Sequence, residues 1–507
     1  MINTLLPLFL IPLIGTLIVL IRPFGTKEEK IQGKRIALLT SILTFIESIR
    51  LWLLFDYNTP QFQFTISFNW LNYIPFTQSK LSLDSGSSII FGVDGISIVF
   101  ILLTTLLIPI CLLASWESVK HLNKAYLICF LGLEILLIGV FTVLDIFGFY
   151  ILFEGVLIPM YLIIGVWGSK SAPSQKVTAA YYFFFYTLIG SVLMLIGILY
   201  LYSISGTTDY LTLLGYEIEA NAQIYLFLAF FASLAVKIPK FPFHIWLPQA
   251  HVEAPVAGSV ILAGILIKLG GYGFIRYTIP LLPEASKYFT PLVFTLAILA
   301  VIYASLTTLR QTDLKRIIAY SSVSHMGIVT LGIFTLNPIG IMGSIFLQLA
   351  HGLVSSALFI VVTILYDRHH TRLVKYYRGI AVTMPIYATI FLFFTLANIA
   401  VPLSCNFVGE FLCLLAAYQV NTIIGILASL GIVLSACYAL FLFNRVCFGE
   451  FSSYLANSAH YSENRDVNRR EWFVLLPLIL LTVVLGIFPN IIMDILHSSV
   501  INLTTYI

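Results

Sequence analysis

Charged and titratable side chains lie inside apolar runs that are long enough to cross a lipid bilayer. A charge near the bilayer centre costs about 2.5 to 3.5 kcal/mol on insertion scales, so such groups usually mark paths for ions. Alternatively, they are paired core residues that only fix helix packing. That alternative weakens because groups of both signs occur in successive runs. The groups are Glu134, Glu154, Lys237, Lys268, His325, His351 and Glu410.

These residue types predict proton transfer. Burial lowers the pKa of a lysine and raises that of a glutamate, whereas a nearby opposite charge reverses both shifts. A Glu–Lys pair whose partners can separate would therefore load and release a proton when it opens. Histidine, with an ordinary pKa of about 6.5, suits the relay positions between such groups.

Metal binding by the histidines is disfavoured. His325 and His351 belong to different apolar runs, without cysteine or carboxylate at ligand spacing. His244 and His251 are seven residues apart in HIWLPQAH and lack the i, i+4 spacing of zinc proteases. We expect packing or proton entry from a loop at these two positions.

The composition describes the elements that must hold these groups. Of the 507 residues, 59% are hydrophobic and only 10% are charged, whereas a soluble domain carries about 25% charged residues. The net charge of +4 gives no indication of a nucleic-acid partner.

No C-x-x-C pair, P-loop or dinucleotide-binding glycine pattern is present, so we expect no redox centre, metal site or nucleotide hydrolysis in this chain. The driving energy must come from an ion gradient or from partner subunits.

Hydrophobic runs predict an all-α polytopic membrane protein with about 14 transmembrane helices. The first run has no basic region and no small-residue cleavage site, so we interpret it as a retained span. The predicted spans are 2–21, 34–55, 94–115, 124–144, 145–167, 176–203, 222–239, 255–280, 287–308, 314–336, 338–366, 382–419, 421–446 and 472–496.

Loop charges predict the orientation. Of the 27 lysines and arginines, 21 fall in loops after odd-numbered spans, Lys240 among them. Basic loops stay on the side from which helices insert, so these loops should face the cytoplasm or matrix and both termini the opposite side. The other six are Lys80, Arg276 and Lys287 in loops after even-numbered spans, and Arg50, Lys237 and Lys268 within spans.

Two spans contain helix breakers at membrane depth. The seventh ends in AVKIPKFPF, where Pro239 and Pro242 follow Lys237. The twelfth contains ANIAVPLSCNFVGEFL, where Pro402 separates two apolar halves and Glu410 opens the second. Irregular backbone at this depth is tolerated only where protein buries it or where it lines a watery cavity. The breaks therefore predict an ion path beside Lys237 and Glu410.

The breaks also predict an internal repeat. Lys237 and Glu410 are 173 residues apart, and Glu154 and His325 are 171 apart. Two consecutive five-helix units would place Lys237 and Glu410 on matching helices, and Glu154 and His325 on another matching pair. Because five is an odd number, the second unit would cross the membrane in the opposite direction to the first. A regular series of spans producing similar offsets by chance is the alternative. The predicted parts are 1–123, repeat one at 124–280, repeat two at 281–450, and 451–507 with the last helix.

Three segments resemble the antiporter-like, proton-pumping subunits of respiratory complex I, the NADH:ubiquinone oxidoreductase. They are FYILFEGVLIPMYLIIGVWG (149–168), VKIPKFPFHIWLPQAHVEAPVAGSVILAGILIKLGGYG (236–273) and LRQTDLKRIIAYSSVSHMG (309–327). LYDRHHTR (365–372) and FVGEF (407–411) resemble one of the three sister chains in particular. The resemblance runs from about residue 90 to 450, and the remainder matches only in its hydrophobicity.

The resemblance implies roles for the matched residues. Glu154 and Lys237 would form a switching ion pair, Lys268 and His351 would relay the proton, and Glu410 would stand before release. His325 in SSVSHMG and Glu117 in ASWES are matched as well. Glu134 is added only because its burial is costly.

The resemblance also implies partners and a location. The chain would be a subunit of an enzyme, with FMN, iron–sulfur clusters and ubiquinone in partner subunits and no cofactor of its own. The other membrane-arm subunits, including two sister antiporter-like chains, would be its partners, with cardiolipin against basic loops such as 368–378. It would lie in the mitochondrial inner membrane with both termini on the intermembrane-space side.

Two alternatives belong to other functional classes. A subunit of an Mrp-type cation/proton antiporter would share these helices and motifs, but it would show sodium-dependent transport without an NADH-oxidising partner. A purely structural spacer would use the charges only to hold helices together. Variants of such a spacer would lose assembly without losing pumping selectively.

Overall fold

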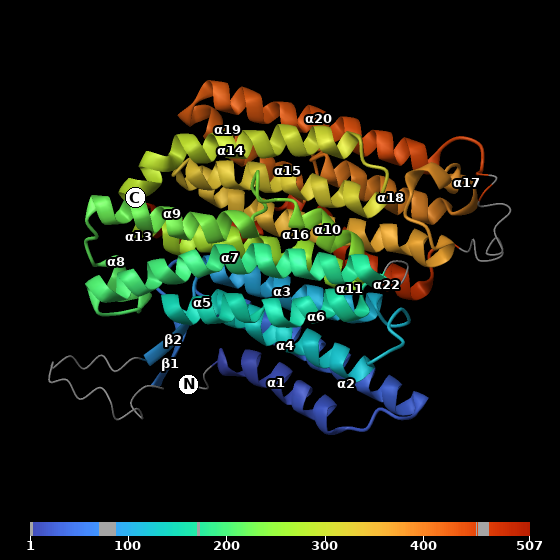
Figure 1. The fold of residues 1–507 in the computed structure, drawn as a ribbon, viewed down its shortest axis with the longest axis horizontal. Helices are drawn as coiled ribbons and strands as arrows, with labels where there is room; N and C mark the ends of the chain where they lie inside the picture. Colours follow the sequence, from blue (N-terminus) through green and yellow to red (C-terminus); the bar gives the residue numbers. More distant parts are fainter. Residues whose placement is uncertain (1–3, 70–87, 170–172, 453, 455–465, 507) are drawn as a thin grey trace.

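The computed structural model describes residues 4–69, 88–169, 173–452, 454 and 466–506. In this part of the chain, helices run side by side as one bundle (Figure 1). The amino-terminal helices are α1 (Leu6–Ile21), α2 (Lys27–Leu54), α3 (Gly95–Ala114) and α4 (Asn123–Thr142). The next group is α5 (Ile146–Gly155), α6 (Leu157–Trp167), α7 (Pro173–Ser205), α8 (Tyr210–Leu214), α9 (Ala220–Lys237), α10 (Trp246–Glu253), α11 (Val256–Ile261), α12 (Ile267–Gly273) and α13 (Ile279–Leu281).

The carboxyl-terminal half continues the bundle. Its helices are α14 (Pro283–Leu309), α15 (Leu314–Phe334), α16 (Pro338–His369), α17 (Ile380–Thr383), α18 (Pro385–Asn398), α19 (Cys405–Val420), α20 (Thr422–Cys447), α22 (Arg469–Ile487) and α23 (Asn490–Thr504). Short π-helical segments are η1 (Leu262–Leu266) and η2 (Phe274–Thr278), and η3 (Val374–Tyr376) is a 3-10 turn.

The chain is an all-α polytopic membrane protein, as predicted. Among the described residues, 12 helical segments are long and apolar enough to cross a membrane. The shorter apolar helices α1, α18 and α19 occupy the first and twelfth predicted spans. The total of 14 crossings stays a prediction.

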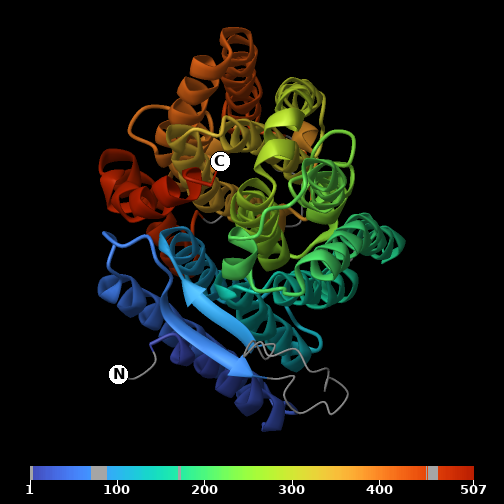
Figure 2. The ribbon, with the colours of Figure 1, turned by 90° about the vertical axis from the view of Figure 1, so that its left-hand side faces the viewer.

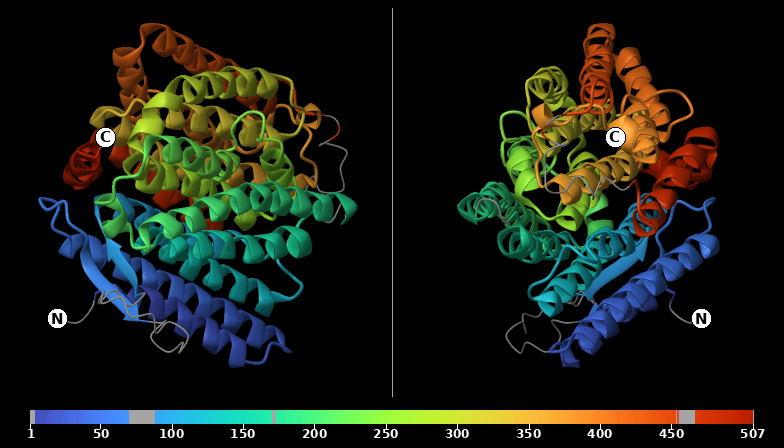
Figure 3. Two further views of the ribbon diagram at one scale, coloured as in Figure 1. Left: turned by 60° about the vertical axis from the view of Figure 1, so that its left-hand side comes forward. Right: turned by 90° about the vertical axis from the view of Figure 1, so that its right-hand side faces the viewer.

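Buried helices lie inside the bundle and exposed apolar helices surround them. The segment from α11 to α13 and the long helix α16 are enclosed by protein, whereas α7 and α20 carry many exposed apolar side chains. Seen end-on, the bundle has α1 and α2 at one edge (Figure 2). The other views place α20 at the opposite edge (Figure 3). Titratable groups on the enclosed helices are therefore shielded from lipid.

A β-hairpin, which the sequence analysis did not predict, caps one end of the bundle. Strand β1 (Gln63–Asn69) pairs antiparallel with β2 (Ser88–Val93). Alternating β-branched and aromatic residues in QFTISFN and SIIFGV favour extended backbone. Figure 1 places the hairpin, α8, α13 and both chain ends at this end, and α17 at the other. We call these the hairpin end and the α17 end.

Both predicted helix breaks are present, and one corrects a prediction. Helix α9 ends at Lys237, and α18 and α19 are separated around Pro402. Lys240 was assigned to an external loop, which is wrong. Its side chain is buried, and its ammonium group donates to Thr330 and, at 3.2 Å, to the carbonyl of Met326. The chain bends inside the bundle at the break and continues as α10.

Three further irregularities were not predicted. Pro159 has no N–H for the carbonyl of Gly155, and the fifth span changes from α5 to α6 at Val156, two residues after Glu154. The π-helices η1 and η2 interrupt the predicted span 255–280, and Arg276, which the charge count assigned to a loop, is a buried residue of η2. The last predicted span ends early, because α22 stops at Ile487 and α23 begins after Pro489.

Candidate functional site

Four titratable side chains from four helices form one buried line, which we call the central line. The ammonium group of Lys268 in α12 lies 2.8 Å from Nδ1 of His351 in α16. The His351 and His325 rings have centroids 5.5 Å apart. Nδ1 of His325 in α15 lies 2.6 Å from a carboxylate oxygen of Glu410 in α19. The structure therefore brings these four predicted residues together.

Local irregularity places both ends of the central line. Lys268 follows the π-helix η1, and its ammonium group also donates to the carbonyl of Ala263. π-Helical turns are rare and often occur at functional sites. Glu410 lies in the second turn of α19, after the break. A Cβ on Gly409 would meet the backbone of Leu347 at 2.7 Å, so only glycine permits this approach of α19 to α16.

Glu154 and Lys237 face each other without a closed ion pair. They are within electrostatic range, but no nitrogen–oxygen distance of 4.0 Å or less joins these two described residues. The ammonium group of Lys237 lies 4.4 Å from the ring centroid of Phe153, and it has no hydrogen-bond partner within the described part of the chain. Oε1 of Glu154 is likewise unpartnered among the described residues. The predicted ion pair is therefore not formed in this structure.

Unpartnered buried polar atoms gather along the same route. Within the described residues, Nε2 of His325, Nε2 of His351 and the side-chain amide of Gln348 have no hydrogen-bond partner. Gln348 precedes His351 by one turn, and a Cβ on Gly271 of α12 would collide with its amide. Buried polar groups are almost always satisfied by protein or ordered water. The clustering of these atoms is therefore typical of a route that holds water.

His244 and His251 lie outside the central line. The ring of His251 stacks on Phe359, with centroids 4.6 Å apart. His251 is also within electrostatic range of Lys268 and Lys315. His244 lies beside the rings of Phe241 and Tyr303. Among the described residues, no group of three or more His, Cys, Asp or Glu side chains is placed to hold a metal ion.

Three residues near the line were not singled out in the sequence. Lys240 was assigned to a loop, although its position between Pro239 and Pro242 indicated the break. Lys315 was assigned to a loop as well, yet it is buried and donates to the carbonyl of Ala254 at 2.9 Å. Gln348 carries no charge, and its only signal is its place one helical turn before His351.

Besides the Glu154–Lys237 pair, two predicted residues lie outside the central line. Glu134 is fully buried, but it accepts a hydrogen bond from Thr44 of α2 on the other side of α4. Glu117 follows α3, is exposed, and pairs with Arg470 at 2.6 Å. The cost of burial predicts that a charge has a special environment, but it does not predict which neighbour the charge faces.

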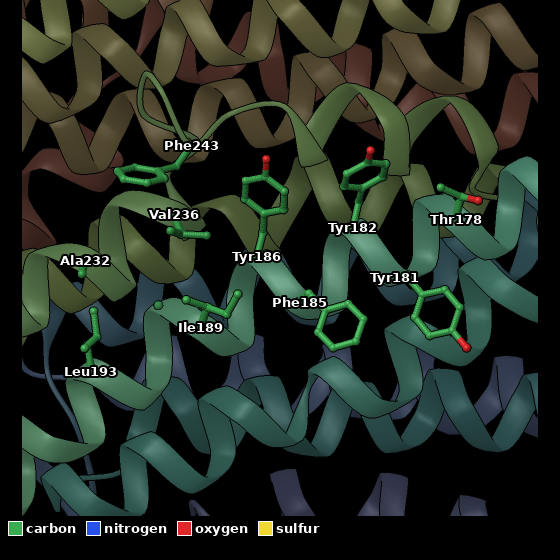
Figure 4. A pocket seen from close by; sticks show the side chains of 11 residues that line it. Thr178, Tyr181, Tyr182, Phe185, Tyr186, Ile189, Leu193, Ala232, Val236 and Phe243 are labelled. Carbon is green, nitrogen blue, oxygen red and sulfur yellow. The ribbon is translucent and has the colours of Figure 1, made fainter.

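Two cavities lie elsewhere in the described part of the bundle. At the α17 end, a polar cavity of about 930 Å³ is lined by Glu117, Lys120, Lys315, Asp367 and Arg372, among others. Basic loops thus meet at one end of the bundle. An apolar groove of about 490 Å³ lies on the outer faces of α7 and α9 (Figure 4), lined mainly by aromatic side chains of α7. Lys315 lines the polar cavity, which water can enter. The apolar groove has no charged side chain in its lining.

Sequence comparisons assign the family. Residues 35–142 match the family model for the amino terminus of NADH-ubiquinone oxidoreductase chain 4, and residues 143–435 match a model described as NADH:quinone oxidoreductase/Mrp antiporter, TM. NADH-ubiquinone oxidoreductase chain 4 of Metridium senile is 54% identical over 493 residues, covering 97% of this chain and 96% of the relative. The chain belongs to the NADH-ubiquinone oxidoreductase chain 4 family.

The chain 4 relatives correct the extent of the resemblance. The Chondrus crispus protein of this name is 52% identical over 501 residues, which is 99% of this chain and 97% of the relative. The similarity therefore includes the first 90 and the last 55 residues, which the motifs matched only in hydrophobicity. Whole-length chain 4 relatives at this identity do not favour an Mrp-type antiporter subunit.

Two solved structures share the fold of this chain 4 family member. A chain of respiratory complex I from Thermus thermophilus with bound NADH superposes with a TM-score of 0.84 at 30% identity, covering 99% of each chain. A chain of the membrane-bound sulfane sulfur reductase, an archaeal respiratory membrane complex, gives the same TM-score and coverage at 22% identity. The second match shows the fold alone.

Proposed function

We propose that this chain is a proton-translocating membrane-arm subunit of respiratory NADH:ubiquinone oxidoreductase. The observation that carries the proposal is the buried contact series from Lys268 through His351 and His325 to Glu410. Each of these groups can bind and release a proton, and each lies within a few ångströms of the next. A proton can therefore cross the middle of the bundle in short transfers between side chains and water.

The Glu154–Lys237 pair would control loading of the line. With the pair open, Lys237 has no counter-charge within 4.0 Å among the described residues, so it would be free to pass its proton on. Closing the pair would stabilise the charged lysine again. Alternation between the two states would deliver a proton toward Lys268 and return Lys237 to its starting state. Electron transfer in partner subunits would drive this alternation.

The surroundings proposed for the chain follow from its family. FMN, iron–sulfur clusters and ubiquinone would reside in other subunits, and two sister antiporter-like chains would flank this chain in the membrane arm. The basic loops at the α17 end would face the matrix of a mitochondrial inner membrane, with both termini on the intermembrane-space side. Cardiolipin would bind near residues 368–378. Residues 124–280 and 281–450 would be inverted repeats that contribute one half-channel each.

Replacing Glu410 with glutamine tests this function at the release end of the line. We expect the number of protons pumped per electron to fall, because glutamine has nearly the same shape but does not titrate. The loss should be partial, since His325 still accepts a proton. The measurement is acidification by proteoliposomes containing the purified complex, with NADH oxidation followed in parallel. An undiminished ratio would remove Glu410 from the path.

A sodium control separates the proposal from cation exchange. Pumping by the same proteoliposomes should be equal in sodium and potassium buffers. Transport that needs sodium and proceeds without NADH oxidation would instead indicate an antiporter.

A further inference from the structure

A buried ion pair closes the hairpin end of the helix that carries Lys268. Nη2 of Arg276 in η2 lies 2.5 Å from a carboxylate oxygen of Asp94, and the two side chains are only 4% and 5% exposed. An arginine five residues before the end of a span normally extends its guanidinium group into water and headgroups. Arg276 instead lies under Phe62, beside the hairpin, with its guanidinium carbon 5.0 Å from the ring centroid.

The pair is held from several elements at once. Asp94 is the N-cap of α3 and accepts from the backbone N–H of Ser97 at 2.9 Å. Arg276 donates to the hydroxyl groups of Ser97 and Tyr272, at 3.2 and 3.3 Å. The guanidinium group also lies 5.8 Å from the ring centroid of Tyr210 in α8. A guanidinium group paired with a carboxylate is thus fixed in position where the hairpin, α3, α8 and the Lys268 helix converge.

Aromatic rings fill the space next to the pair, and we call them the aromatic collar. Tyr272 lies one turn after Lys268 on the same helix, and its ring contacts Phe100 and Phe141 at centroid distances of 5.7 and 5.1 Å. Phe100 and Phe141 stack on each other at 5.1 Å. All three rings are buried. The hydroxyl of Tyr272 donates to the carbonyl of Phe141 at 3.1 Å, which leaves no mobile polar group in the collar.

We propose that Arg276, held by Asp94 above the aromatic collar, is an electrostatic barrier that keeps protons at Lys268 from leaking to the hairpin end. A fixed arginine repels protons and other cations, and close-packed rings exclude the water that would conduct them. Protons at Lys268 then pass to His351 and onward. This inference rests on the proposed function, because it assigns the barrier that makes the central line directional.

Passive proton leak tests the barrier without requiring turnover. Proteoliposomes with the purified complex are given a pH gradient in the absence of NADH, with potassium and valinomycin to clamp the potential. We expect Arg276→Gln to raise the leak rate several-fold, whereas Asp94→Asn should not, since it keeps both the N-cap and the positive charge. Tyr272→Phe, which keeps the ring, should not raise it either. Arg50→Gln, which removes a partly exposed pair with Glu47 outside the barrier, is the matched control.

The remaining outcomes decide between a barrier and a conduit. An unchanged leak in Arg276→Gln would overturn the barrier. So would equal leaks in Arg276→Gln and Asp94→Asn, because lost packing would then be the cause. Loss of NADH-driven pumping without leak in Asp94→Asn and Tyr272→Phe would show a conduit.

If Arg276→Gln fails to assemble, a double variant that combines Arg276→Gln with Asp94→Asn replaces it. The double variant leaves no unpaired buried charge, and the barrier requires that it leak. A wild-type complex that never pumps would contradict the proposed function, while the leak comparison would stand.

Discussion

Proton pumping by the complex is expected to stop when Lys268 is replaced by methionine. Lys268 links to His351 at 2.8 Å, and it is fully buried between the two halves of the bundle. Methionine fills a similar volume but carries no proton. An added barrier of only about 1.4 kcal/mol slows a step tenfold, so we expect coupled NADH:ubiquinone activity to fall by about tenfold or more. Acidification and NADH oxidation measured together would report the loss.

Assembly should survive this change. Replacing a buried charge by an apolar side chain of similar volume is often neutral or stabilising. The complex carrying Lys268→Met should therefore be recovered in normal amounts, as should one carrying Lys27→Met at the exposed start of α2. The Lys27 variant should pump normally. Normal pumping by both variants would exclude Lys268 from the path, and lost assembly in the Lys268 variant alone would favour the structural-spacer alternative.

The second large effect is expected from the switching pair. Glu154→Gln removes the carboxylate that lies within electrostatic range of Lys237, and among the described residues no carboxylate oxygen lies within 4.0 Å of the Lys237 ammonium group. The buried lysine then has no carboxylate with which it can form and break an ion pair. Lys237 would therefore no longer pass protons to the central line. We expect pumping to be abolished, as read from protons pumped per electron. Glu47→Gln, which changes a carboxylate paired with Arg50 outside the central line, should leave this ratio unchanged.

A double variant tests whether the two residues act as one unit. Residues that form one functional pair show strongly non-additive losses. Glu154→Gln combined with Lys237→Met should therefore be no worse than either change alone. Losses that multiply would mean that Glu154 and Lys237 act independently and do not form a switch.

The sequence predicted the helical fold and the two large breaks because both depend on local signals. Apolar runs of about 20 residues are sufficient to identify spans, and Pro239 and Pro402 mark the breaks beside Lys237 and Glu410. The fate of the chain after a break depends on packing instead. Lys240 was therefore misplaced, since a chain that bends inside the bundle and one that leaves it have the same local sequence. The π-helices around Lys268 likewise have no local signature in the sequence.

Contacts within the site could be predicted only in part. The cost of burying charge identified His325 and Glu410, but their 2.6 Å contact joins residues 85 positions apart. It depends on the close approach of α19 to α16 that Gly409 permits. The same cost identified Glu134, whose hydrogen bond to Thr44 points away from the central line. A sequence indicates which groups are expensive to bury, whereas packing decides which of them meet.

A high-resolution cryo-EM map of the assembled complex, with ordered waters resolved, tests the central claim most directly. The claim is that the buried groups form one hydrated route from Lys237 to Glu410. We predict ordered water at the ammonium group of Lys237, at the Gln348 amide, and at Nε2 of both His351 and His325, linking them into a continuous hydrogen-bonded series. Dry apolar packing between Lys237 and Lys268 in every conformational state of the complex would contradict the account.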